Sequence, residues 1–105
     1  MIKTLRLMLE YKCYPVWLYD ENDNIIDTLL PEELRNDAKL DSKFDDLQAR
    51  YDALFIDNEH EFSFVGFKTI EEKKSFINDW NSAIQELTEK TEGKYTIIND
   101  IDKAF

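Results

Sequence analysis

The sequence predicts a single α+β domain over residues 1–105, with a largely antiparallel sheet of about five strands and two amphipathic helices. Three observations support this fold class. Several short apolar segments alternate with polar residues or end at turn-forming residues, as strands do. Two later segments repeat apolar residues every three or four positions, as helices that pack on a sheet do. The expected order is a strand, a two-stranded hairpin, a helix, a strand, a helix and a last strand.

The N-terminal segment predicts a strand and not a signal peptide. Strict alternation over residues 4–12 gives this strand one buried face, formed by Leu5, Leu7, Leu9 and Tyr11. Charges at Arg6 and Glu10 and the lack of a small-residue cleavage site argue against a secretory signal. No apolar run approaches the ~20 residues of a membrane helix. We therefore expect a cytoplasmic protein.

Residues 14–31 predict a β-hairpin that is apolar on both faces. Asp20–Asn24 supplies the turn formers between two arms, Val16–Tyr19 and Ile25–Leu30. Successive side chains of a strand point to opposite faces, so Trp17 and Tyr19 should share one face and their neighbours the other. Each face therefore needs a cover, and a partner could supply one of the two.

A helical turn at residues 31–34 and a helix beginning at Asp41 or Ser42 are predicted next. The apolar residues of this helix form one stripe: Phe44, Leu47, Tyr51 and Leu54. Polar residues run beside that stripe at the same spacing: Asp41, Asp45, Gln48 and Asp52. This acidic edge is either an ordinary solvated flank or a rim that Lys and Arg of a partner engage.

The C-terminal half predicts a strand, a second helix and a last strand. Residues 57–60 should form a turn before a strand at Glu61–Phe67 that is apolar on both sides. Thr69 and Glu72 form a capping box, which opens a helix whose core stripe is Ile70, Phe76, Ile77, Trp80, Ile84 and Leu87. Gly93 should end that helix, ahead of a strand at Tyr95–Ile98 and a polar tail over residues 99–105.

The charge of the chain is strongly negative and confined to one region. Acidic residues number 23 against 13 basic ones, for a net charge of −10. Residues 15–66 hold 14 of the acidic and 4 of the basic residues, so the whole excess lies there. Such a field repels nucleic acid and anionic lipid and attracts basic proteins. We expect a basic protein partner and no direct nucleic-acid or membrane binding, although solubility alone would also explain the charge.

The residue patterns of most enzymes and metal sites are missing. With His60 as the single histidine and Cys13 as the single cysteine, few nucleophile–base pairs or metal-ligand sets can form. Asp20, Asn22 and Asn24 match the start of a calcium loop, but the glycine and the bidentate glutamate of such a loop are absent. Two glycines are too few for a phosphate loop. We expect no catalytic residue, no metal and no cofactor.

The run WLYDENDNIIDTLLPEEL at residues 17–34 carries a resemblance to a known class of proteins, together with LFIDN at 54–58 and FSFVGF at 62–67. It is similar to small acidic immunity-like proteins of Gram-positive (Firmicutes) polymorphic toxin systems. The resemblance implies a protein that neutralises a secreted toxin, often a basic nuclease, by masking its active surface. It implies no particular site residue.

The leading hypothesis is an acidic binding protein that masks a basic toxin domain. Aromatic side chains supply anchoring contacts at interfaces, and carboxylates steer a basic partner toward them. The candidate partner-binding residues are Trp17, Tyr19, Asp20, Asp23, Asp41, Asp45, Tyr51 and Asp52. Two alternatives stay open. One is a small cytoplasmic adaptor or regulatory protein, in particular a homodimer that buries the second sheet face against itself, and the other is a carboxylate-dependent hydrolase.

Overall fold

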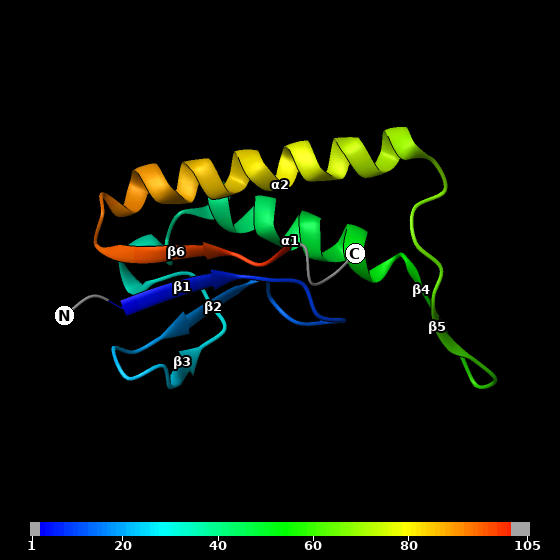
Figure 1. The fold of residues 1–105 in the computed structure, drawn as a ribbon, viewed down its shortest axis with the longest axis horizontal. Coiled ribbons are helices and arrows are strands. Elements are labelled where there is room, and N and C mark those ends of the chain that lie inside the picture. Colours follow the sequence, from blue (N-terminus) through cyan, green and yellow to red (C-terminus); the bar gives the residue numbers. More distant parts are fainter. Residues whose placement is uncertain (1–2, 102–105) are drawn as a thin grey trace.

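A computed structural model describes residues 3–101 and shows an α+β protein with two long helices (Figure 1). The elements in chain order are β1 (Lys3–Leu7), β2 (Val16–Tyr19), β3 (Ile25–Asp27), the 3-10 helix η1 (Glu32–Leu34), α1 (Ala38–Asp52), β4 (Phe55–Asp57), β5 (Phe62–Phe64), α2 (Ile70–Thr91) and β6 (Tyr95–Asn99). The molecule measures 46 × 27 × 24 Å, and the hairpin of β4 and β5 forms one end of it.

The strands form two sheets, which differs from the predicted single sheet of about five strands. The main sheet has the order β3-β2-β1-β6, and β2 is antiparallel to both β1 and β3. β6 is parallel to β1, because the long connection through both helices returns the chain in the direction in which it started. β4 and β5 make the second sheet as an antiparallel pair. The prediction of antiparallel pairing is therefore confirmed for β1–β3 and wrong for β6.

Three predicted strands are longer than the observed ones. β1 ends at Leu7, because the chain leaves the sheet there in a loop over residues 8–15, the β1–β2 loop. β3 ends at Asp27, whose carboxylate accepts hydrogen bonds from the Thr28 N–H (2.9 Å) and the Arg35 guanidinium (3.3 Å). The strand expected at residues 61–67 is only β5. The helical turn expected at residues 31–34 is confirmed as η1.

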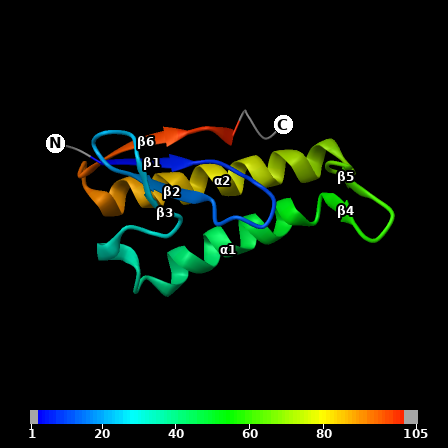
Figure 2. The same ribbon diagram turned by 90° about the horizontal axis from the view of Figure 1, so that it is seen from below.

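Both helices lie on one face of the main sheet, side by side (Figure 2). The inward side chains of β1 and β2 are buried, namely Leu5, Leu7, Val16 and Leu18. Trp17 and Tyr19 point to the other face, as predicted, and are half-buried. No helix of the described residues covers this outer face. Within residues 3–101, the helices therefore cover one of the two apolar faces of the hairpin of β2 and β3 and leave the other uncovered.

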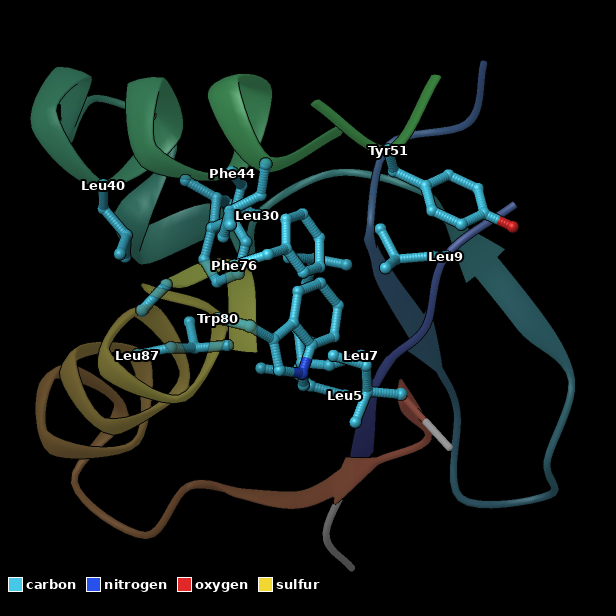
Figure 3. Packing of buried hydrophobic residues seen from close by; sticks show 14 of the residues in the cluster. Leu5, Leu7, Leu9, Leu30, Leu40, Phe44, Tyr51, Phe76, Trp80 and Leu87 are labelled. Atoms are coloured by element: carbon cyan, nitrogen blue, oxygen red, sulfur yellow. The ribbon is translucent and has the colours of Figure 1, made fainter. Parts of the chain in front are cut away.

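The core lies between the helices and the main sheet, with Phe76 and Trp80 at its centre (Figure 3). Their rings stack with centroids 6.4 Å apart, and both side chains are 0% exposed. The Trp80 indole N–H donates to the Asn99 side-chain oxygen at 3.0 Å, which ties α2 to the end of β6. Asn99 therefore belongs to β6 and not to the predicted polar tail, of which residues 102–105 lie outside the described residues.

Helix α1 begins at Ala38, earlier than the sequence predicted, so the expected start at Asp41 or Ser42 is wrong. Its N-cap is Asp37, whose carboxylate accepts the Leu40 N–H at 3.1 Å and also pairs with Lys90 of α2. The hydrogen bond from Lys90, followed by that from the Leu40 N–H, lowers the pKa of Asp37. The predicted apolar stripe is confirmed, because all four of its members are buried: Phe44, Leu47, Tyr51 and Leu54.

Helix α2 begins at the predicted capping box. The Thr69 hydroxyl accepts the Glu72 N–H at 3.1 Å, whereas the Glu72 carboxylate accepts the Lys68 N–H at 3.2 Å. Most of the predicted stripe packs in or against the core, but Ile70 is 69% exposed. Ile70 is the first residue of the helix, where the chain arrives from the hairpin and the core has not yet begun, so its inclusion in the stripe is wrong.

The C-terminus of α2 offers a test of backbone strain. Glu92 caps the helix with φ of 52°, a left-handed conformation that glycine adopts at no steric penalty, and Gly93 follows with φ of 79°. We expect Glu92→Gly to raise the free energy of unfolding by up to about 1 kcal/mol. Glu89→Gly, three residues earlier within the helix, should lower it by about 1 kcal/mol. Urea titration of both variants checks this, and equal losses would contradict it.

Candidate functional site

Exposed apolar side chains gather at two places on the described structure. Five of them lie on the hairpin of β4 and β5 and on the segment that leads into α2, and we call this set the hairpin-end patch: Ile56, Phe62, Phe64, Val65 and Ile70. The other three surround β3: Ile25, Ile26 and Leu29. Clusters of exposed large apolar side chains on a small protein mark contact sites more often than scattered single residues do.

The turn of the β4–β5 hairpin is tightly organised by Asn58. Its side-chain oxygen accepts the N–H groups of His60 (2.8 Å) and Glu61 (3.0 Å), and its own N–H donates to the Glu61 carbonyl at 2.9 Å. An asparagine that closes a turn in this way holds both strands in one register. The sequence prediction of a turn at residues 57–60 is confirmed for residues 58–60, whereas Asp57 belongs to β4, and the turn joins two strands of a hairpin and does not lead from α1 into the main sheet.

Aromatic contacts fix the hairpin to the body of the protein. Phe55 of β4 stacks on Phe62 of β5, with ring centroids 5.5 Å apart. Tyr11 of the β1–β2 loop contacts both of these rings, at 4.7 and 5.1 Å, and Tyr51 of α1 contacts Phe55 at 5.2 Å. Aromatic pairs at such distances favour a defined arrangement of the rings. Phe62 is held by these contacts and is nevertheless 59% exposed.

An open groove runs beside the hairpin, between the C-terminal end of α1 and the start of α2. It encloses about 650 Å³, and its lining includes Leu54, Val65 and Phe67. Arg50 also lines it and is neutralised by Asp79 (2.7 Å) and Asp46 (3.6 Å). A mainly apolar groove with its arginine already paired suits side chains of a protein better than a charged small molecule.

The hairpin also concentrates negative charge. Asp57, Glu59 and Glu61 are all exposed, and residues 55–67 contain no lysine or arginine. Asp57 accepts a hydrogen bond from the Tyr11 hydroxyl at 3.0 Å, whereas Glu59 has no ion pair among the described residues. The exposed phenylalanines therefore lie in a local field that attracts a basic surface.

The predicted acidic edge of α1 faces the β1–β2 loop, and two of its carboxylates are used there. Asp41 accepts the Tyr14 hydroxyl at 2.8 Å, and Asp52 accepts the Lys12 N–H at 2.7 Å. Burial, then the Asp41 hydrogen bond, raises the pKa of Tyr14. Asp45 is exposed, and partial desolvation followed by repulsion from Asp41 raises its pKa. Asp45 is thus the carboxylate of this edge that remains available to a partner.

The remaining predicted residues lie elsewhere. Trp17 and Tyr19 are on the outer face of the main sheet, where the Arg6 guanidinium lies 5.1 Å from the centre of the Tyr19 ring. Asp20 closes the β2–β3 turn, because its carboxylate accepts the N–H groups of Asn24 (2.9 Å) and Asn22 (2.8 Å), and these bonds lower its pKa. Asp23 is exposed in the same turn with φ of 63°.

Tyr51 is 6% exposed and belongs to the core, beside Leu9 (Figure 3). The eight predicted partner-binding residues are therefore not brought together. They lie on the outer sheet face, in the β2–β3 turn and along α1. Of these places, α1 adjoins the hairpin, and Tyr51 reaches it through its contact with Phe55.

A family model described as Serratia CdiI immunity protein-like matches residues 3–100. The chain belongs to this family. The immunity protein thus neutralises a toxin, and the match supports the resemblance to immunity proteins of toxin systems. A search of curated proteins found no match. The Firmicutes origin that the resemblance implied stays a prediction.

Family membership indicates that this immunity protein acts as an inhibitor that binds a toxin. Within residues 3–101, no three His, Cys, Asp or Glu side chains converge as metal ligands. In the same range, no helix is both long and apolar enough to cross a membrane.

Sequence reasoning missed the hairpin-end patch of this immunity protein. Phe62, Phe64 and Val65 had been assigned to a strand, apolar on both sides, of a single sheet of about five strands, whereas all three are exposed on a separate hairpin. A signal was available: three carboxylates at alternate positions, Asp57, Glu59 and Glu61, border these residues. A central strand rarely follows so acidic a connection, whereas a projecting hairpin tolerates it.

Proposed function

We propose that this immunity protein neutralises a basic toxin domain by binding to it and masking the surface with which the toxin contacts its substrate. Family membership carries the toxin-binding role. The charge supports a basic partner, because the whole excess of −10 falls within residues 15–66, which span β2 to β5. A nuclease is the toxin class that fits best, since an enzyme that grips nucleic acid presents a basic surface.

The exposed carboxylates divide between two tasks in this proposal. Asp23, Asp45 and Glu59 are exposed and form no ion pair among the described residues, so they are available to attract the toxin from a distance. Asp41 and Asp52 hold the β1–β2 loop and act through the field they create. A toxin that degrades nucleic acid inside the cell requires its inhibitor in the cytoplasm, and we place the protein there.

The proposal is tested by titrating the protein with the toxin domain encoded by the adjacent gene. We expect a stable complex whose dissociation constant rises at least about tenfold when salt is raised from about 50 to about 500 mM, because screening weakens the attraction between the two charged surfaces. Toxin activity on a nucleic-acid substrate should be lost at one equivalent of the immunity protein.

Each part of the proposal can fail separately. Absence of a complex would contradict the inhibitor role. A dissociation constant that does not change with salt concentration would contradict a basic partner. A complex in which the toxin keeps full activity would contradict masking. Activity on a substrate other than nucleic acid would overturn only the nuclease assignment.

A further inference from the structure

The β4–β5 hairpin projects from the body of the molecule, beyond the C-terminal end of α1 and the start of α2 (Figure 1). It carries Phe62, the most exposed aromatic side chain among the described residues, at 59%. Val65, where the chain leaves the hairpin, is 57% exposed. A convex element with apolar side chains on its surface fits a concave apolar surface, because only a concavity can surround it and remove it from water.

The hairpin is also held in one position before any partner arrives. Asn58 fixes its turn, and the contacts of Phe55 and Phe62 with Tyr11 fix its orientation on the β1–β2 loop. A contact surface that is already ordered loses little conformational freedom on binding, so more of the contact energy remains as affinity.

Charge specifies the chemistry of the surface that would receive the hairpin. Glu59 and Glu61 flank His60 in the sequence at the tip of the hairpin, and Asp57 is the last residue of β4. Their field disfavours an acidic or purely apolar partner and favours one whose apolar cavity has Lys and Arg at its rim. A cleft that binds an anionic substrate has such a rim.

We propose that the β4–β5 hairpin is the anchor of this immunity protein and enters a basic-rimmed cleft of the toxin domain, with Phe62 filling its apolar floor. The inference rests on the proposed function and adds the part of the chain that makes the contact. It explains how a small protein could mask an active surface, because a projecting hairpin fills a cleft that a flat face would only cover.

The β3 region fits this role less well. Its exposed side chains are aliphatic, whereas interface centres are enriched in aromatic residues. The carboxylate on β3 itself, Asp27, is paired with Arg35 at 3.3 Å. Ile25, which is 51% exposed, therefore provides a matched control for Phe62 in a second hairpin of the same protein.

The first test compares Phe62→Ser with Ile25→Ser in titrations against the toxin domain encoded by the adjacent gene. We expect Phe62→Ser to weaken binding about 100-fold, as loss of a central anchor does, and Ile25→Ser to weaken it less than about threefold. Circular dichroism and thermal unfolding of both variants show whether the fold persists. Equal affinities of the two variants would overturn the inference.

A second test does not remove any contact within the hairpin. In a Cys13→Ser background, His60→Cys places a thiol at the hairpin tip and Asn22→Cys places one in the β2–β3 turn, and both native residues are exposed. Attachment of a polyethylene glycol maleimide should abolish complex formation for the first protein and leave the second able to bind. Binding by the labelled hairpin protein would contradict the proposed anchor.

The outcomes separate the inference from the proposed function. If the unaltered protein does not bind the toxin domain, the proposed function fails and the anchor fails with it. If the unaltered protein binds, but Phe62→Ser and the labelled His60→Cys protein bind equally well, the anchor alone is wrong. If the unaltered protein is a dimer and Phe62→Ser is a monomer by light scattering, a second copy of the chain covers the hairpin, which also overturns the inference.

Discussion

Replacement of Trp80 by alanine is expected to lower the free energy of unfolding by about 3–5 kcal/mol. Trp80 is fully buried at the centre of the core, where its ring stacks on Phe76. The substitution leaves a cavity between α2 and the main sheet. It also removes the indole N–H that donates a hydrogen bond to the Asn99 side-chain oxygen at 3.0 Å. A domain of this length has a total stability of about 5–15 kcal/mol, so about a fifth or more of it should be lost.

Trp80→Phe is the matched control for this prediction. It keeps an aromatic ring on Phe76 but removes the indole N–H, so it isolates the hydrogen bond to Asn99 together with a smaller loss of volume. We expect a loss of about 1–2 kcal/mol. Urea unfolding monitored by circular dichroism measures both variants. A loss for Trp80→Ala no larger than for Trp80→Phe would show that the core collapses around the missing ring.

Gln48→Ala should lower the free energy of unfolding by about 1–3 kcal/mol, because two buried acceptors lose the amide group that donates to them. The Gln48 amide is 8% exposed and donates to the Glu10 carbonyl at 2.7 Å and to the Asp52 carboxylate at 2.8 Å. Its own side-chain oxygen is buried without a hydrogen-bond partner among the described residues, so its removal offsets part of the loss and favours the lower half of that range. Hydrogen exchange should show the β1–β2 loop opening before the core.

Gln48→Glu adds a test with a defined dependence on pH. The new carboxyl group would face the Asp52 carboxylate and the Glu10 carbonyl, both of which disfavour its ionised form, so its pKa in the folded protein is raised above that in the unfolded chain. At pH 7 the variant should therefore be less stable than Gln48→Ala. The deficit should shrink as the pH falls toward about 5, where the group binds a proton in the folded state. A deficit that grows on acidification would contradict this placement.

Local sequence patterns determined most of the elements but not the sheet to which each strand belongs. The stripe that includes Phe44 and Leu47 and the capping box at Thr69 gave the helices, because periodicity and capping depend on residues within one or two turns. The pairing of β6 with β1 joins distant segments, and nothing within Tyr95–Asn99 records a direction. The sequence pattern of an apolar strand such as β5 is the same whether another part of the chain or a partner protein covers the strand.

The types of residue in the candidate site could be predicted from the sequence, but their position in the fold could not. The exposed phenylalanines Phe62 and Phe64 lie within the acidic region, but exposure could not be read from the sequence. Tyr51 is buried, with its ring against Phe55 and Phe64, and Asp41 and Asp52 are engaged by Tyr14 and the Lys12 N–H. These contacts join segments that are far apart in the chain. Phe62 is exposed because its hairpin continues past the end of α1, which only the assembled fold reveals.

The parallel pairing of β1 with β6 bears on the point of its synthesis at which the chain can complete its fold. Lys3 lies opposite Tyr95 and Leu5 opposite Ile97, positions roughly 90 residues apart, so the main sheet is completed by a contact between distant parts of the sequence. During synthesis on the ribosome, β1–β3 and α1 emerge early, but α2 has no complete sheet to pack on until β6 follows. We therefore expect a chain that ends before β6 to lack the complete main sheet and to bind a toxin poorly.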